Sequence, residues 1–116
     1  MNPRVLLIVT GDPRLSPRPA EAIRIAAGLG VWQKADITLY LRDAAVLALS
    51  ESAEEFVDED HYTRYLPMLG SPGHPVYVQR GAAQLNQLGA APVRFEEIDD
   101  AQLAALAARS DSVAHF

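Results

Sequence analysis

Apolar residues come in short runs along the chain, separated by segments of mixed character. The run RVLLIVT at 4–10 is continuous and rich in β-branched residues. Such a run is typical of a strand that is buried on both faces of a parallel sheet. Similar runs predict four more strands, at 36–43, 75–79, 92–98 and 112–116.

Helical spacing marks the segments between these runs. Between Pro19 and Leu29 a helix is predicted, because small and apolar residues recur every three or four positions and would face the sheet. These residues are Ile23, Ala26, Ala27 and Gly30. A second helix is predicted over 99–110, with Asp99 or Asp100 as its N-cap. Shorter helical segments are expected at 44–50, 61–70 and 82–89.

Strands and helices therefore alternate along the whole chain. Alternation of this kind implies parallel strands joined by right-handed crossovers, with helices on both faces of the sheet. A length of 116 residues favours one domain. We predict a single three-layer α/β/α domain over 1–116, with a mostly parallel sheet of five strands.

In open sheets of this class, ligands bind beyond the carboxyl ends of the strands. The sequence identifies four such ends, and any site should draw on them. They are Thr10-Gly11-Asp12, Leu41-Arg42-Asp43, Gln79-Arg80-Gly81 and Glu97-Ile98-Asp99.

The loop GDPRLSPR, at 11–18, is one candidate for anion binding. Backbone N–H groups at a helix start attract phosphate or carboxylate, and Arg14 and Arg18 add positive charge. Gly11 and Asp12 complete the candidate set. The loop lacks the spacing of a P-loop or of a dinucleotide fingerprint. The alternative is a proline-stiffened connection with solvated arginines.

The junction Gln79-Arg80-Gly81 is the second candidate, because it follows a buried strand and precedes a helical segment. Arg80 could clamp a carboxylate or a sulfur oxyanion with its planar fork. Gln79 could instead cap the next helix or pack at a subunit interface. Asp43 also follows a strand, where a helix N-cap and a ligand contact are both open roles.

Composition narrows the possible functions. A net charge of −5 disfavours nucleic acid as a partner. The chain contains no cysteine, which removes disulfides, thiolate metal sites and every cysteine mechanism. The three histidines have no ligand spacing, so we predict no metal site, no cofactor and no catalytic residue. No apolar stretch approaches the roughly 20 residues of a membrane span, and we expect a cytoplasmic protein.

Several segments together resemble a known family. They are the N-terminal strand, the proline-containing loop, EAIRIAAGLG, ITLYLRDAAV, PVYVQRGAAQLNQLG and the C-terminal DSVAHF. This pattern resembles the DsrE/DsrF-like proteins of sulfur relay. The resemblance implies a flavodoxin-like fold and assembly into homotrimers or hexamers, in some cases mixed with sister subunits. It also implies a persulfide-carrying cysteine after the third strand.

In this chain that position falls within Gln79 to Ala82, where no cysteine is present. A persulfide needs a thiolate, so the signature activity of the family cannot be transferred to this chain. We therefore expect an oligomeric scaffold, subunit or binding protein, for which a sister subunit is one partner to consider. The first alternative is a small module that binds an anion or nucleotide through 11–18 and Arg80. The second is an acid–base enzyme that uses Asp12, Asp43 or Glu97.

Overall fold

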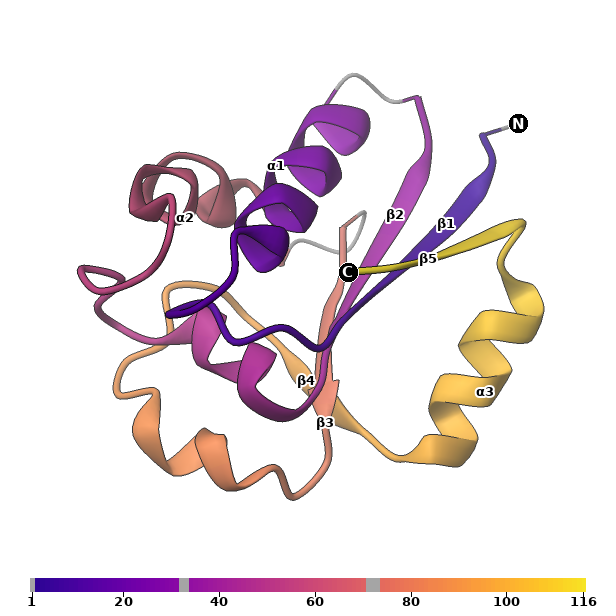
Figure 1. Ribbon diagram of the computed structural model, residues 1–116. Helices are drawn as coiled ribbons and strands as arrows, with labels where there is room; N and C mark the ends of the chain where they lie inside the picture. Colours follow the sequence, from indigo (N-terminus) through magenta and orange to yellow (C-terminus); the bar gives the residue numbers. More distant parts are fainter. Residues whose placement is uncertain (1, 32–33, 71–73) are drawn as a thin grey trace.

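The computed structural model describes residues 2–31, 34–70 and 74–116. Its elements alternate between strands and helices, with short 3₁₀ helices labelled η (Figure 1). In chain order they are β1 (Arg4–Val9), α1 (Arg18–Val31), β2 (Asp36–Leu41), η1 (Asp43–Leu49), α2 (Glu59–Tyr65), η2 (Leu66–Met68), β3 (Val76–Gln79), η3 (Ala83–Gln87), β4 (Glu96–Ile98), α3 (Asp100–Arg109) and β5 (Ser112–His115).

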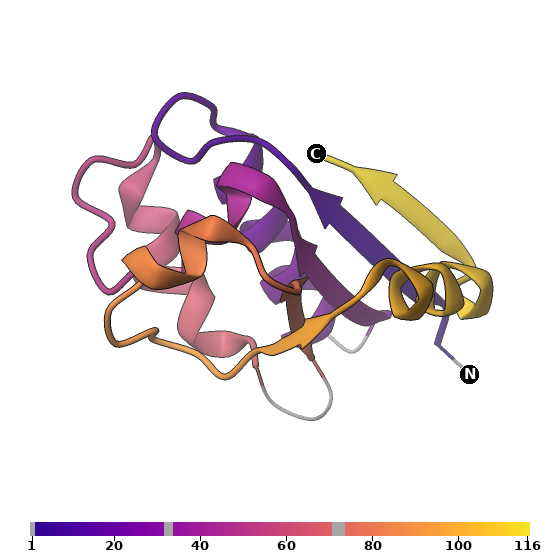
Figure 2. The same ribbon diagram turned by 90° about the horizontal axis from the view of Figure 1, so that it is seen from below.

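The strands form one five-stranded sheet in the order β4-β3-β2-β1-β5. Every neighbouring pair is parallel, so the sheet is entirely rather than mostly parallel. The chain steps in one direction from β1 to β4 and then returns to place β5 beside β1. Because right-handed crossovers in opposite directions cover opposite faces, α3 lies across the sheet from α1 and η1 (Figure 2). This is the predicted α/β/α arrangement.

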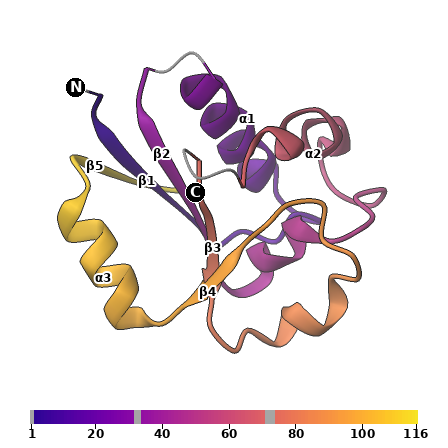
Figure 3. The same cartoon turned by 180° about the vertical axis from the view of Figure 1, so that it is seen from behind.

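The two faces of the sheet differ in how deeply they are buried. The α1 face holds a large core to which alternate residues of β1 and β2 contribute, among them Leu7, Leu39 and Leu41. The other face buries only a small cluster around Leu6 and Tyr40. Helix α3 is the helix that covers this second face (Figure 3). It has no fully buried residue.

Helix α1 packs as its sequence predicts. Ile23 and Ala26 are fully buried in the main core, and Ala27 is nearly so. Gly30 has a more specific reason to be glycine, because a Cβ there would lie 2.7 Å from Cε1 of His74. The imidazole therefore rests directly on the backbone of α1.

Two predicted elements are markedly shorter than expected. The predicted strand at 92–98 forms only at 96–98, because the segment 93–95 diverges from β3 and pairing begins at Tyr77 and Glu96. The predicted helix at 82–89 is the 3₁₀ helix η3. It has no side-chain cap and no buried residue, so little tertiary packing offsets the cost of helix nucleation. No helix in the described ranges is long and apolar enough to cross a membrane.

Candidate functional site

Polar groups converge at the carboxyl ends of β2, β3 and β4, which are adjacent in the sheet. The side-chain Oε1 of Gln79 accepts a hydrogen bond of 3.0 Å from the backbone N–H of Asp43. Asp43 has a left-handed backbone with φ of 55°, a conformation that aspartate tolerates better than most residues. Gln79 thus ties the end of β3 to the first residue of η1.

The turn after β3 is tied to β4 in the same way. Gly81 has a φ of 73°, and its backbone N–H donates to Oε1 of Glu97 at 3.1 Å. The backbone N–H of Arg80 donates to the carbonyl oxygen of Ile98 at 2.9 Å. The Arg80 guanidinium lies 3.5 Å from Asp99 and is half exposed. The whole turn is therefore hydrogen-bonded to the neighbouring strand.

Arg42 joins β2 to the start of α3. Its guanidinium donates to Asp100 at 2.8 Å and to the Tyr40 hydroxyl at 3.2 Å. The bond to Asp100 raises the pKa of Arg42 above its ordinary value. Burial raises the pKa of the Tyr40 hydroxyl, against the opposing effect of the Arg42 hydrogen bond. Both side chains keep their ordinary protonation states at neutral pH.

We call this set of contacts the carboxyl-edge network. Its members are Tyr40, Arg42, Asp43, Gln79, Arg80, Gly81, Glu97, Asp99 and Asp100.

The remaining candidates lie in the loop after β1 and, for Arg18, at the first residue of α1. Asp12 accepts hydrogen bonds from the Arg14 backbone and guanidinium, which hold the pKa of its carboxyl below the usual range. The Arg18 guanidinium donates to the carbonyl oxygen of His115 at 2.8 Å and lies over the ring of Phe116. Both arginines therefore already have partners within the chain.

The structure separates the predicted site residues into two groups. Asp43, Gln79, Arg80 and Gly81 belong to the carboxyl-edge network. The others, Gly11, Asp12, Arg14 and Arg18, lie at the end of β1, on the far side of β2. No hydrogen bond or ion pair among residues 2–31, 34–70 and 74–116 joins the two groups.

Some members of the network could not be recognised as site residues from local sequence. Tyr40 lies inside a strand and Asp100 inside a helix. Arg42, Glu97 and Asp99 do fall at predicted strand ends. The parallel arrangement of the strands was therefore the only indication in the sequence that they lie near the site. The contact between the Arg18 guanidinium and the ring of the C-terminal Phe116 could not be predicted from the sequence around either residue.

The chemistry that the network itself offers is limited. Its strand-end amides and guanidinium groups are bonded to the chain's own oxygens, and Gln79 and Arg80 are not nucleophiles. In the part of the chain that the structure describes, no three histidine, aspartate or glutamate side chains are grouped to hold a metal ion. The arrangement therefore holds the neighbouring strand ends together and leaves charged side chains exposed beside them.

Comparison with known proteins shows the fold. No family model matches the sequence, and no curated protein matches it either. Among solved structures, the crystal structure of ychN protein from E. coli matches with a TM-score of 0.76 and 20% identity. The match covers 100% of both chains. The chain therefore shares its α/β fold with the E. coli ychN protein over its full length.

Proposed function

We propose that this chain is a DsrE/DsrF-like protein that serves as a non-catalytic subunit or binding protein rather than as a sulfur carrier. One observation carries the proposal. The turn after β3, where the resemblance places the sulfur-carrying cysteine, consists of Gln79, Arg80 and Gly81 and is closed by hydrogen bonds within the chain. The full-length likeness to the E. coli ychN structure supports the fold on which this comparison depends.

The closed turn favours a structural over a catalytic role. Transfer of sulfane sulfur requires a thiolate that forms a persulfide and releases it by exchange. The backbone N–H groups of Asp43, after β2, and of Gly81, after β3, already donate to Gln79 and Glu97, so they are not free to bind a ligand or a reacting group.

Self-association is the second part of the proposal. Val113 of β5 pairs in register with Leu6, so it lies on the sheet face that α3 covers. Its side chain is 39% exposed, and Tyr77 on the same face is also partly exposed. A further copy of the chain, or a sister subunit, would bury this thinly covered apolar face. A homotrimer or homohexamer is the assembly that the resemblance implies.

A sulfur-loading experiment tests the catalytic part. The chain and its Gln79→Cys variant are incubated with a persulfide donor, and intact mass is measured before and after reduction. We expect one reducible sulfur atom on the variant and none on the parent chain. Reducible sulfur on the parent chain would contradict the proposal. A Gln87→Cys variant, in η3, controls for the reactivity of any exposed thiol.

Light scattering coupled to gel filtration tests the assembly. We expect three or six times the chain mass of 12.6 kDa. Val113→Asp should weaken the oligomer, because it places charge on the thinly covered face. Leu15→Asp is the matched control, since Leu15 is 81% exposed in the loop after β1. A monomer at micromolar concentration would contradict the proposed assembly.

A further inference from the structure

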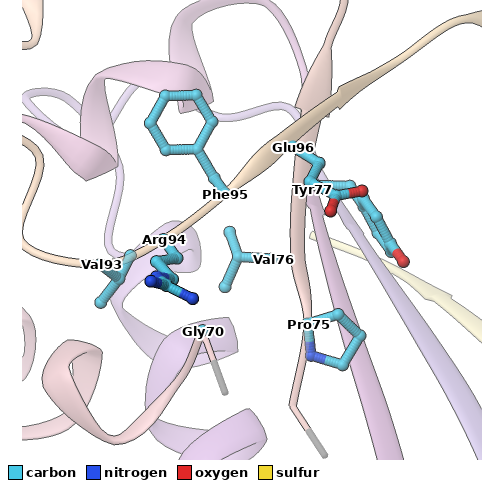
Figure 4. Close-up of a pocket in the computed structure, with 8 residues that line it drawn as sticks. All are labelled: Gly70, Pro75, Val76, Tyr77, Val93, Arg94, Phe95 and Glu96. Carbon is cyan, nitrogen blue, oxygen red and sulfur yellow. The ribbon is translucent and has the colours of Figure 1, made fainter. Parts of the chain in front are cut away.

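A groove lies beside the amino-terminal ends of β3 and β4. The carboxyl-edge network lies at the other end of the same two strands. Pairing of the two strands begins at Tyr77 and Glu96, so the preceding segments separate. The space between Pro75–Val76 and 93–95 has a volume of about 630 Å³ (Figure 4). Pockets for small molecules commonly have volumes of about 300–1,000 Å³.

The wall of the groove at Gly70 depends on close packing of the backbone. Gly70 has a φ of 85°, and its N–H donates to the carbonyl oxygen of His74 at 2.8 Å. A Cβ at Gly70 would lie 3.1 Å from the carbonyl oxygen of Arg94 and 3.2 Å from its nitrogen. Glycine therefore allows this turn to approach the segment that carries Arg94, and the groove is bounded by packed main chain.

Apolar side chains and one cation line the groove. Val76 is buried, and Tyr77 and Val93 are partly exposed. In Figure 4 the Arg94 side chain lies between Val93 and Val76, with its guanidinium near Gly70. Arg94 forms no ion pair with any residue of the ranges 2–31, 34–70 and 74–116.

This cation differs from the arginines described above. Arg14, Arg42 and Arg80 each have a carboxylate partner, and Arg18 binds a carbonyl oxygen. Arg94 has no carboxylate partner within the described ranges, although the net charge of the chain is −5. A guanidinium beside apolar walls suits a carboxylate, which it can hold through two parallel hydrogen bonds.

We propose that the groove binds a small organic monocarboxylate with an apolar body. Arg94 binds the carboxylate, and Val76 and Val93 contact the body. Glu96 also lines the groove. Its negative charge disfavours a second anionic group, so a dicarboxylate or a phosphate ester fits less well. This inference goes beyond the proposed function, because Arg94, Val76 and Val93 belong neither to the turn after β3 nor to the apolar face that α3 covers.

Titration with benzoate, followed by amide chemical shifts in ¹⁵N-labelled protein, tests the proposal. We expect saturable shifts confined to the amides of residues 70, 76, 77 and 93–96. Benzamide, a neutral molecule of similar shape, should bind at least about tenfold more weakly, which corresponds to one charge-assisted hydrogen bond. Phthalate, which carries a second carboxylate, should also bind more weakly than benzoate.

Two variants complete the test. Arg94→Gln should abolish saturable benzoate binding while leaving the rest of the amide spectrum unchanged. Arg109→Gln is the matched control, because Arg109 is also exposed but lies at the end of α3, outside the groove. Absence of saturable shifts, equal binding of benzamide, or full binding by Arg94→Gln would each overturn the proposal.

Discussion

The side-chain oxygen of Gln79 accepts a hydrogen bond of 3.0 Å from the backbone N–H of Asp43, two residues that are 36 positions apart. This bond joins the carboxyl ends of β3 and β2. It holds Asp43 at a left-handed backbone conformation that few non-glycine residues adopt. The residue at the position expected to be reactive in a sulfur carrier thus has a structural role here.

Loss of this bond should measurably destabilise the protein. Gln79→Ala should lower the free energy of unfolding by about 0.5–1.5 kcal/mol, the usual net contribution of one hydrogen bond. Urea denaturation measures the change. Gln87→Ala is the control, because Gln87 is an exposed glutamine of η3, and it should leave the stability nearly unchanged. Equal stability of the two variants would contradict the role given to Gln79.

The N-cap of α3 should contribute more than the ion pair beside it. Asp99 accepts from the backbone N–H of Gln102, whose side chain accepts from the N–H of Asp99. Asp99→Ala should therefore cost about 1 kcal/mol in urea denaturation. Asp100→Ala removes the exposed pair with Arg42 and should cost only a few tenths of a kcal/mol. The reverse order would show that the capping box is not what stabilises α3.

Two glycines of α1 should respond oppositely to alanine. Gly28→Ala should raise the free energy of unfolding by about 0.5–1 kcal/mol, because alanine is the better helix former and a Cβ meets nothing within 4 Å. Gly30→Ala should lower it by about 1–3 kcal/mol, because the new Cβ overlaps the His74 ring. Thermal unfolding of both variants provides the comparison.

A double variant identifies the cause of the Gly30 effect. If the His74 ring is the obstacle, His74→Ala should remove most of the cost of Gly30→Ala, and the double-mutant cycle will be non-additive. Additive costs would instead assign the effect to the helix backbone.

The Asp12–Arg14 pair should make stability depend on acid pH. The Arg14 guanidinium hydrogen-bonds to the carboxyl of Asp12 and holds its pKa below the usual range in the folded protein. Its contribution is thus fully present above the unfolded-state pKa of about 3.9 and is lost as the pH falls through the lowered folded value. The difference in unfolding free energy between the parent chain and Asp12→Asn should therefore vanish at low pH. A constant difference from pH 7 down to pH 2 would contradict this account.

The sequence predicted the bounds of β1 better than those of β4, although β5 at the other edge of the sheet was predicted to within one residue. The run at 4–10 became β1 because two-sided burial leaves a continuous apolar signal. The segment 92–98 mixes apolar residues with Arg94, Glu96 and Glu97, and only 96–98 pairs with β3. Gly70 packs closely against Val93 and Arg94, a contact that local composition does not encode.

The candidate site was predictable in its position and not in its contacts. Parallel alternation placed Asp43, Gln79 and Gly81 at one edge of the sheet, and the structure brings them together. That Gln79 and Glu97 would occupy the backbone N–H groups there follows from strand order and register, which emerge only on folding. The sequence indicated no role for Arg94, since the groove that it lines exists only where β4 separates from β3.

Native mass spectrometry of the protein, gently purified from its own cells, tests the central claim most directly. The account predicts a mass of three or six chains of 12.6 kDa, or a complex with a sister subunit, and no covalently bound sulfur. A monomer, or a chain that carries a sulfur adduct, would contradict the assignment of this protein as a non-catalytic subunit.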